Sequence, residues 1–161
     1  MILDQEAFLQ RYGGVYEHSP WIAQASWAKG REAATAAELS AIMSAVVNQA
    51  EKSKRLALIR AHPDLAGRLA VAGELTTASA DEQASAGLDQ CSPEEFTTLQ
   101  RLNQDYKKKF SFPFVMAVKN SNRHKIMAAC KKRLENDYDS EFDQAIAEIH
   151  QIARLRLEQL F

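Results

Sequence analysis

The chain has 161 residues, of which 46% are apolar and 25% charged, and its formal net charge is −1. This composition is that of a globular domain of average length and excludes a disordered chain. The nearly neutral charge argues against binding to nucleic acid, which requires a basic excess or a basic face. Alanine occurs 26 times, whereas glycine occurs 6 times and proline 4 times, so the composition favours helices.

The sequence lacks the features that are typical of secreted, membrane-spanning or metal-binding proteins. The two cysteines, Cys91 and Cys130, are too few for a disulfide framework or a zinc cluster. No basic and apolar leader opens the chain, and the longest apolar run, residues 112–118, is far shorter than the roughly 20 residues of a membrane span. We therefore expect a cytoplasmic protein with no bound metal and no contact with membranes.

Helix start and stop signals follow one another along the chain. Thr35 with Glu38 and Ser79 with Glu82 have the spacing of capping boxes. The predicted helices begin at Asp4, Ser19-Pro20, Thr35, Leu56, Ser79, Ser92-Pro93, Asn122 and Ser140. The sequence thus predicts an all-α, single-domain helical bundle of about seven to nine helices over residues 1–161. Short connections would make neighbouring helices antiparallel.

Residues 112–118 form the one stretch that could be a strand. Its content of β-branched residues is low, so we interpret it as a buried segment that is either extended or helical.

Several common catalytic motifs are missing from the sequence. It has no Gly-rich phosphate loop, no nucleophile elbow and no His-x-x-x-His pair, and its four histidines are scattered. An enzyme built on this chain would therefore work with acid–base groups and hydrogen bonds, without nucleotide or metal.

The first candidate site residue is His62, in the run His62-Pro63-Asp64-Leu65. A residue before proline favours an extended backbone, so the imidazole can project from the end of a helix into a cleft. Histidine is the side chain whose ordinary pKa lies nearest neutrality, which suits proton transfer. The alternative is a histidine that only caps a helix or lies on the surface.

The second candidate is the group Ser79, Glu82 and Gln83. A capping box alone would explain Ser79 and Glu82. A helix N-terminus beside a carboxylate and an amide would also suit a polar ligand rich in urea-like N–H and C=O groups. Both interpretations remain open at this point.

The third candidate is Arg156, which falls on the apolar stripe of the last predicted helix, whereas Arg154 does not. A buried unpaired arginine is very unfavourable, so Arg156 requires an anionic partner, either internal or a ligand. The alternative is an arginine that extends to water from the end of the helix.

The fourth candidate is the segment from Asn103 to Phe114. Its three consecutive lysines, residues 107–109, are typical of a solvated face. The sequence Phe112-Pro113-Phe114 is either core or the apolar wall of a pocket that offers backbone hydrogen bonds.

Together, in this order, these segments resemble the 2-oxo-4-hydroxy-4-carboxy-5-ureidoimidazoline (OHCU) decarboxylase family. The matching elements are His62-Pro63-Asp64-Leu65, Ser79-x-x-Glu82-Gln83, Leu102-Asn103 through Tyr106, Lys109-Phe110, Phe112-Pro113-Phe114-Val115 and Arg156-Leu157. The resemblance implies an all-α homodimer without cofactor, which forms (S)-allantoin in the last step of urate breakdown. Two positions depart from the family pattern, because Ser111 and Asn120 stand where glycine is common.

The resemblance also implies roles for individual residues. The catalytic residues would be His62, Glu82 and Arg156. The substrate-binding residues would be Pro63, Ser79, Gln83, Phe114, Val115, Met116, Ala117 and Val118. In this interpretation, His62 transfers a proton and polarises the hydroxyl-bearing carbon, while either His62 or Glu82 delivers the final proton. The competing hypotheses are a helical interaction domain without activity and an unrelated cofactor-free lyase or isomerase.

Overall fold

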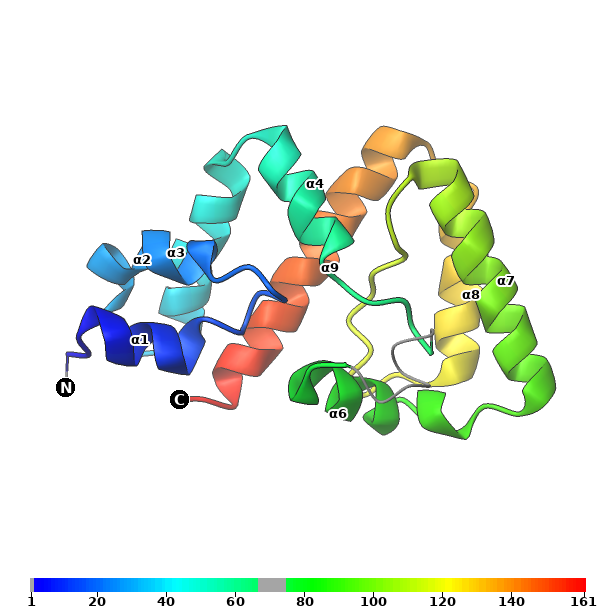
Figure 1. Ribbon diagram of the computed structural model, residues 1–161, viewed down its shortest axis with the longest axis horizontal. Coiled ribbons are helices and arrows are strands. Elements are labelled where there is room, and N and C mark those ends of the chain that lie inside the picture. Colours follow the sequence, from blue (N-terminus) through cyan, green and yellow to red (C-terminus); the bar gives the residue numbers. More distant parts are fainter. Residues whose placement is uncertain (1, 67–74) are drawn as a thin grey trace. The chain divides into compact units, whose positions relative to one another are not determined.

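The computed structural model describes residues 2–66 and 75–161, shown in Figure 1. These residues form eight α-helices and a short 3₁₀ helix, and no strand occurs among them. The all-α class and the number of helices predicted from the sequence are therefore confirmed.

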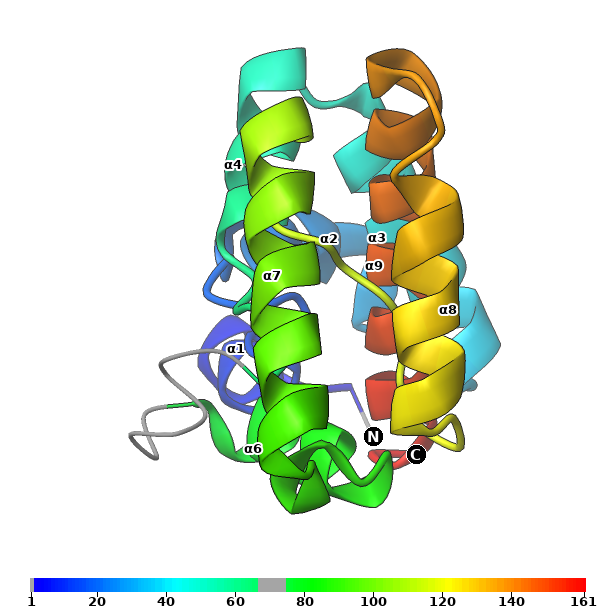
Figure 2. The same ribbon diagram turned by 90° about the vertical axis from the view of Figure 1, so that its right-hand side faces the viewer.

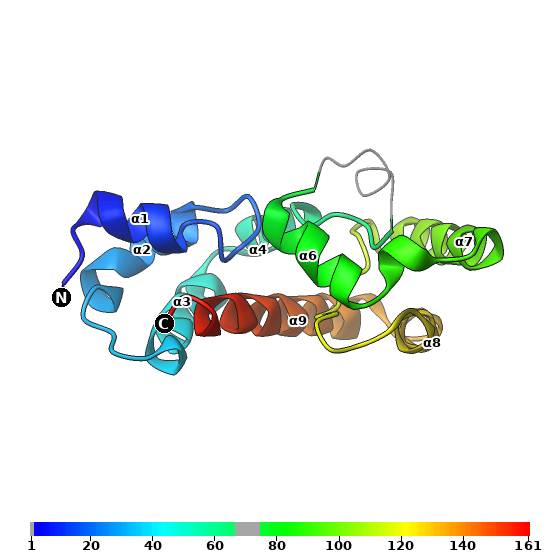
Figure 3. The ribbon, with the colours of Figure 1, turned by 90° about the horizontal axis from the view of Figure 1, so that it is seen from below.

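The described residues divide into two compact units. The first contains residues up to Ala61 together with Ile146–Phe161, and the second runs from His62 to Ala145. Helix α9 (Tyr138–Glu158) is one continuous helix that contributes its first residues to the second unit and the rest to the first unit (Figure 3).

The first unit is built from α1 (Gln5–Tyr12), α2 (Trp21–Gly30), α3 (Ala36–Gln49), α4 (Lys52–Arg60) and the end of α9. Its fully buried side chains include Phe8, Ile22, Leu39 and Met43. Helix α2 packs against both α1 and α3. A Cβ atom at Gly30 would lie 2.7 Å from Leu39 Cδ1 and 3.2 Å from Phe8 Cζ, so glycine allows this close approach.

The second unit contains α6 (Thr77–Ser85), the 3₁₀ helix Leu88–Gln90, α7 (Pro93–Phe110), α8 (Arg123–Arg133) and the start of α9. Helices α7 and α8 lie side by side and run in the same direction (Figures 1 and 2). The expectation that neighbouring helices are antiparallel is wrong for this pair. The connection between them is long enough to return along α7 before α8 begins.

That connection contains residues 112–118, which are extended and mostly buried, so the extended alternative is confirmed. Ser111 ends α7 with φ 62°, and Asn120 has φ 65°. Both values lie in the left-handed region that glycine adopts without strain. This explains why glycine is common at these two positions of the family pattern.

Side-chain caps confirm several predicted helix starts. Asp4 accepts a hydrogen bond from Ala7 N at 2.8 Å, and Thr35 and Asn122 cap α3 and α8 in the same way. At α7, Ser92 and Glu95 form a complete capping box, with Pro93 in the first turn.

The predicted capping box of Ser79 and Glu82 is wrong. Helix α6 begins at Thr77, and Thr76 is its N-cap, because the Thr76 hydroxyl accepts the hydrogen bond of Ser79 N at 3.2 Å. Ser79 and Glu82 therefore lie inside the helix, and capping does not explain why these residue types occur there.

Three other helix starts also differ from the prediction. Ser19 does not cap α2, since Pro20 occupies the N-cap position and the Ser19 hydroxyl donates to the Glu17 carbonyl at 2.9 Å. Helix α4 begins at Lys52 rather than near residue 56, and α9 begins at Tyr138 rather than at Ser140. The first turns of α4 and α9 consist mostly of polar residues, so the apolar pattern used for the prediction begins later than each helix does.

Candidate active site

His62 lies at the start of the second unit, directly after the residues that end α4. The side chain is buried, with 7% of the residue exposed, while Pro63 and Asp64 are half-buried. The solvated surface histidine considered from the sequence is therefore excluded.

Gln83 of α6 binds the backbone that follows His62-Pro63. Its Oε1 accepts a hydrogen bond from Ala66 N at 2.8 Å, and its Nε2 reaches the Asp64 carbonyl at 3.5 Å. The amide oxygen is thus already used within the protein. The weakly held Nε2 is the end of the side chain that remains for the carbonyl oxygen of a ligand.

Helix α7 holds the same segment from another side. Asn103 donates from Nδ2 to the Leu65 carbonyl at 2.9 Å, and Gln100 donates to the Ala66 carbonyl at 2.5 Å. Lys107 binds Asp64, with 2.6 Å between Nζ and Oδ2. Residues 107–109 are all exposed, so the predicted solvated face is confirmed, and Lys107 additionally binds Asp64 from this face.

These contacts bring three of the predicted segments together within one unit. The backbone of Ala66 is left-handed, with φ 51°, a conformation that needs surrounding contacts to hold it in a residue other than glycine. Side chains from α6 and α7 supply these contacts. The turn that carries His62 is consequently fixed on its C-terminal side by Gln83, Gln100 and Asn103.

Ser79 and Glu82 lie on α6 close in sequence to Gln83. Ser79 is 5% exposed and Glu82 is half-buried. Residues 79 and 83 are one turn apart on a helix, so their side chains share a face. The predicted group of hydroxyl, carboxylate and amide thus projects from one short helix.

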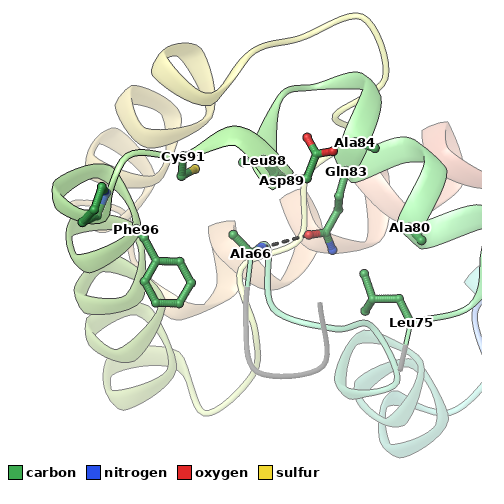
Figure 4. A pocket seen from close by; sticks show the side chains of 10 residues that line it. Ala66, Leu75, Ala80, Gln83, Ala84, Leu88, Asp89, Cys91 and Phe96 are labelled. Carbon is green, nitrogen blue, oxygen red and sulfur yellow. Dashed lines mark hydrogen bonds between the residues drawn. The ribbon is translucent and has the colours of Figure 1, made fainter. Parts of the chain in front are cut away.

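A cavity of about 550 Å³ lies beside this helix (Figure 4). The residues that line it are Ala66, Leu75, Ala80, Gln83, Ala84, Leu88, Asp89, Cys91, Pro93 and Phe96. Gln83 is the one predicted site residue among them, and its side chain reaches across to Ala66 in the figure. The walls are largely apolar, and burial raises the pKa of the Cys91 thiol, so Cys91 is a poor nucleophile there.

The predicted wall of the site, Phe114, Val115, Met116, Ala117 and Val118, belongs to the same unit. Phe114, Val115 and Val118 are buried, whereas Met116 and Ala117 are half-buried. Because this segment belongs to no helix or sheet in the described part of the chain, regular secondary structure does not use its backbone groups, although the Val115 carbonyl already accepts a hydrogen bond from Arg133.

Arg156 lies in the first unit and is 8% exposed, as its position on the apolar stripe predicts. Its Nη2 lies 3.0 Å from Oε2 of Glu17, which is 2% exposed. Its Nη1 donates to the carbonyls of Gly14 and Val15 at 3.3 and 3.4 Å. The anionic partner required by the sequence argument is thus present within the chain.

Glu17 is a residue that sequence reasoning missed. It is separated from Arg156 by 139 positions, and no pattern in the sequence links the two. The available indication was only that a buried arginine requires a carboxylate somewhere in the chain.

No metal site or membrane-spanning helix appears in residues 2–66 and 75–161. No cluster of three or more His, Cys, Asp or Glu side chains there is arranged to bind a metal ion. No helix of that part is both long and apolar enough to cross a membrane.

Comparison with known proteins supports the resemblance over nearly the whole chain. The family model described as OHCU decarboxylase matches residues 2–158. The chain is 44% identical to the 2-oxo-4-hydroxy-4-carboxy-5-ureidoimidazoline decarboxylase of Haloferax volcanii, over 99% of this chain and 92% of that protein.

Two crystal structures have a similar fold. One is of (S)-allantoin synthase, with a TM-score of 0.78 and 28% identity, and the match covers 99% of this chain and 51% of the other. The second is of an OHCU decarboxylase in the presence of (S)-allantoin, with a TM-score of 0.73 and 23% identity over 99% of both chains. From the family match and the close relative, this chain belongs to the OHCU decarboxylase family.

Proposed function

We propose that this chain decarboxylates OHCU to (S)-allantoin and that His62, Glu82 and Arg156 are its catalytic residues. The family and its curated relatives make the chain a decarboxylase, a carboxy-lyase of urate degradation. One observation carries the assignment of the site: Gln83, Asn103 and Lys107 all hold the short segment that follows His62. Gln83 and Asn103, from two of the matching motifs, thus converge on the turn that follows the buried His62.

The reaction suits a site without a cofactor. When the bond between the ring carbon and the carboxylate breaks, CO₂ leaves and its electron pair moves into the neighbouring ring C=N bond of the substrate. The nitrogen takes up a proton, the hydroxyl on the carbon that carried the carboxylate loses its proton to become a carbonyl, and a proton is delivered to the neighbouring ring carbon that carries the ureido group. The loss of CO₂ from the carboxylate thus consumes one proton in total. Because the substrate supplies its own electron sink, no Schiff-base lysine, pyridoxal or metal ion is required.

The protein's contribution is orientation and proton transfer. His62 would polarise the hydroxyl-bearing carbon and move its proton, and burial shields the imidazole from bulk water. Glu82 and the amide of Gln83 would bind the ureido group, and the backbone of residues 114–118 would form the opposite wall. Arg156 would orient an anionic or carbonyl oxygen of the substrate.

The alternative of a helical interaction domain without activity is not favoured. Such a domain gives no reason for Ser79 and Glu82, because the helix cap that would have explained them is formed by Thr76 instead. It also gives no reason for burying an imidazole next to a turn that three side chains hold in place.

The assembly and location of the enzyme are part of the proposal. We infer a homodimer in the cytoplasm that acts on a small ureidoimidazoline and binds neither nucleic acid nor membrane. The family resemblance and the neutral net charge support this inference. Light scattering after size-exclusion chromatography would give twice the 18.0 kDa chain mass for the expected dimer and the single chain mass for a monomer.

The experiment that tests the function follows OHCU generated in situ from urate, with and without the protein. The wild-type chain should accelerate the loss of OHCU well above its spontaneous decay. The His62→Asn variant should lower kcat by about 10²–10⁴-fold, because general acid–base catalysis contributes that much. A folded His62→Asn variant with normal kcat would contradict the catalytic role of His62.

A further inference from the structure

A buried polar network lies in the second unit and centres on Arg133 and Glu141, two residues that the sequence did not indicate as functional. Arg133, the last residue of α8, is 8% exposed, and Glu141 of α9 is fully buried. Arg133 Nε lies 2.7 Å from Glu141 Oε1. The Tyr106 hydroxyl donates to the same oxygen at 2.5 Å, and Asn136 Nδ2 donates to Glu141 Oε2 at 2.9 Å.

Burying this network costs free energy, because its charged groups lose their contact with water, so its presence requires an explanation. Removing two charges from water is offset only when the geometry is good and the other polar atoms are satisfied. Burial raises the pKa of Tyr106, so its hydroxyl remains protonated and serves as a donor to Glu141. An apolar cluster of similar volume would stabilise the unit at least as well.

The guanidinium of Arg133 has a second partner, which lies on the proposed substrate wall. Its Nη1 donates to the carbonyl of Val115 at 2.6 Å. Its Cζ also lies 4.6 Å from the centre of the Phe114 ring, in the range of a cation–π contact. The Arg133 side chain therefore contacts two consecutive residues, Phe114 and Val115, of a segment that belongs to no sheet among the described residues.

We propose that Arg133 is a positioning residue for substrate binding. Glu141 fixes the plane of the guanidinium, and the guanidinium then sets the backbone of residues 114–118 at the place where the ureidoimidazoline binds. This inference rests on the function proposed above and extends it to a residue that does not touch the substrate. Only a planar, forked cation reaches the carboxylate and the carbonyl together, so lysine is not an equivalent replacement.

The role predicts a particular kinetic signature. The wall contacts the substrate in the ground state and in the transition state alike, and loss of such uniform binding raises KM while kcat is retained. Arg133→Lys should raise KM for OHCU, and Kd for (S)-allantoin measured by calorimetry, by about tenfold, because its ammonium can satisfy only one of the two partners. A purely structural role would lower the melting temperature without this change in KM and Kd.

Two further variants distinguish a positioning role of Arg133 from a general loss of stability. Arg123→Lys is the matched control, since Arg123 also forms an arginine–carboxylate pair in this unit, with 2.8 Å between its Nε and Oε2 of Glu95. It should retain the wild-type KM. Asn136→Ala removes only one hydrogen bond to Glu141 from an exposed residue, so it should fold and should raise KM in the same direction but less.

The outcomes are distinguishable. A graded increase in KM from Asn136→Ala to Arg133→Lys, with Arg123→Lys unchanged, supports the positioning role. If the wild type turns over OHCU but both network variants have the wild-type KM and Kd, the positioning role is overturned and the proposed function remains intact. If Arg133→Lys does not fold, Asn136→Ala alone decides. Wild-type protein that neither turns over OHCU nor binds (S)-allantoin would overturn both.

Discussion

The buried pair of Arg156 and Glu17 gives the most exacting prediction about the fold of the first unit. Glu17→Gln retains the shape of the side chain but removes its charge. The Arg156 guanidinium is then left 8% exposed with weaker neutral partners, of which the Gly14 and Val15 carbonyls are 3.3 and 3.4 Å away. Little water is available to replace the carboxylate.

The expected loss of stability is large. Removing one partner of a buried ion pair typically lowers the free energy of unfolding by about 3–5 kcal/mol, because an uncompensated charge remains. Proteins of this size have only about 5–15 kcal/mol in total. We therefore expect Glu17→Gln to lose about a fifth or more of the free energy of unfolding, together with the orientation of Arg156.

Urea unfolding at neutral pH, followed by far-ultraviolet circular dichroism, measures this loss. Glu158→Gln is the matched control, because Glu158 pairs with Arg154 on the same helix at 3.4 Å while both side chains are about half exposed. That pair should contribute less than about 0.5 kcal/mol. Equal, small effects of the two substitutions would refute the claim that Glu17 is the essential partner of Arg156.

Three other predictions concern backbone conformation, acid stability and cofactors. Ser111→Gly should raise the free energy of unfolding by about 0.5–1 kcal/mol, because it relieves a left-handed serine, whereas Asn120→Gly should change it little since asparagine tolerates this conformation. Equal effects in urea unfolding would contradict this reasoning. Hydrogen bonds from the Ser92 backbone N–H and, to a smaller extent, from Arg123 lower the pKa of Glu95 to about 2. The contribution of Glu95 to the free energy of unfolding is therefore complete above its ordinary pKa of 4.5 and is lost as the pH falls towards 2. In acid titrations, Glu95→Gln should show a flatter loss of stability over that range than the wild type, and parallel curves would count against it. Chelation and dialysis should leave turnover of OHCU unchanged, and activity restored by one added metal would contradict the cofactor-free chemistry.

Most of the helices could be predicted because their ends carry local chemistry. Asp4, Thr35, Ser92 and Asn122 cap helices through hydrogen bonds that span three residues, and such contacts can be seen in the sequence. The same reasoning failed at Ser79, because Thr76 lies three positions earlier and competes for the same role. Sequence patterns show that a cap is possible but not which of two neighbouring caps is used.

The candidate site could be predicted only in part, for a physical reason. The burial of Arg156 follows from helical periodicity, and His62, Ser79 and Gln83 are buried as a site requires. Glu17 and Arg133 could not be found, because their roles depend on contacts between residues distant in the sequence. The internal use of the Gln83 amide oxygen was equally invisible before the structure was known.

The stereochemistry of the product tests the central claim most directly. OHCU decays unaided, so faster decay alone could come from loose general catalysis. Free in water, the planar intermediate accepts a proton on either face, whereas a site with His62 and Glu82 on one side and residues 112–114 on another exposes a single face. Circular dichroism of allantoin formed from urate in situ, corrected for the uncatalysed background, should show only the S enantiomer. Racemic allantoin formed at an enzyme-dependent rate would contradict proton delivery by this site.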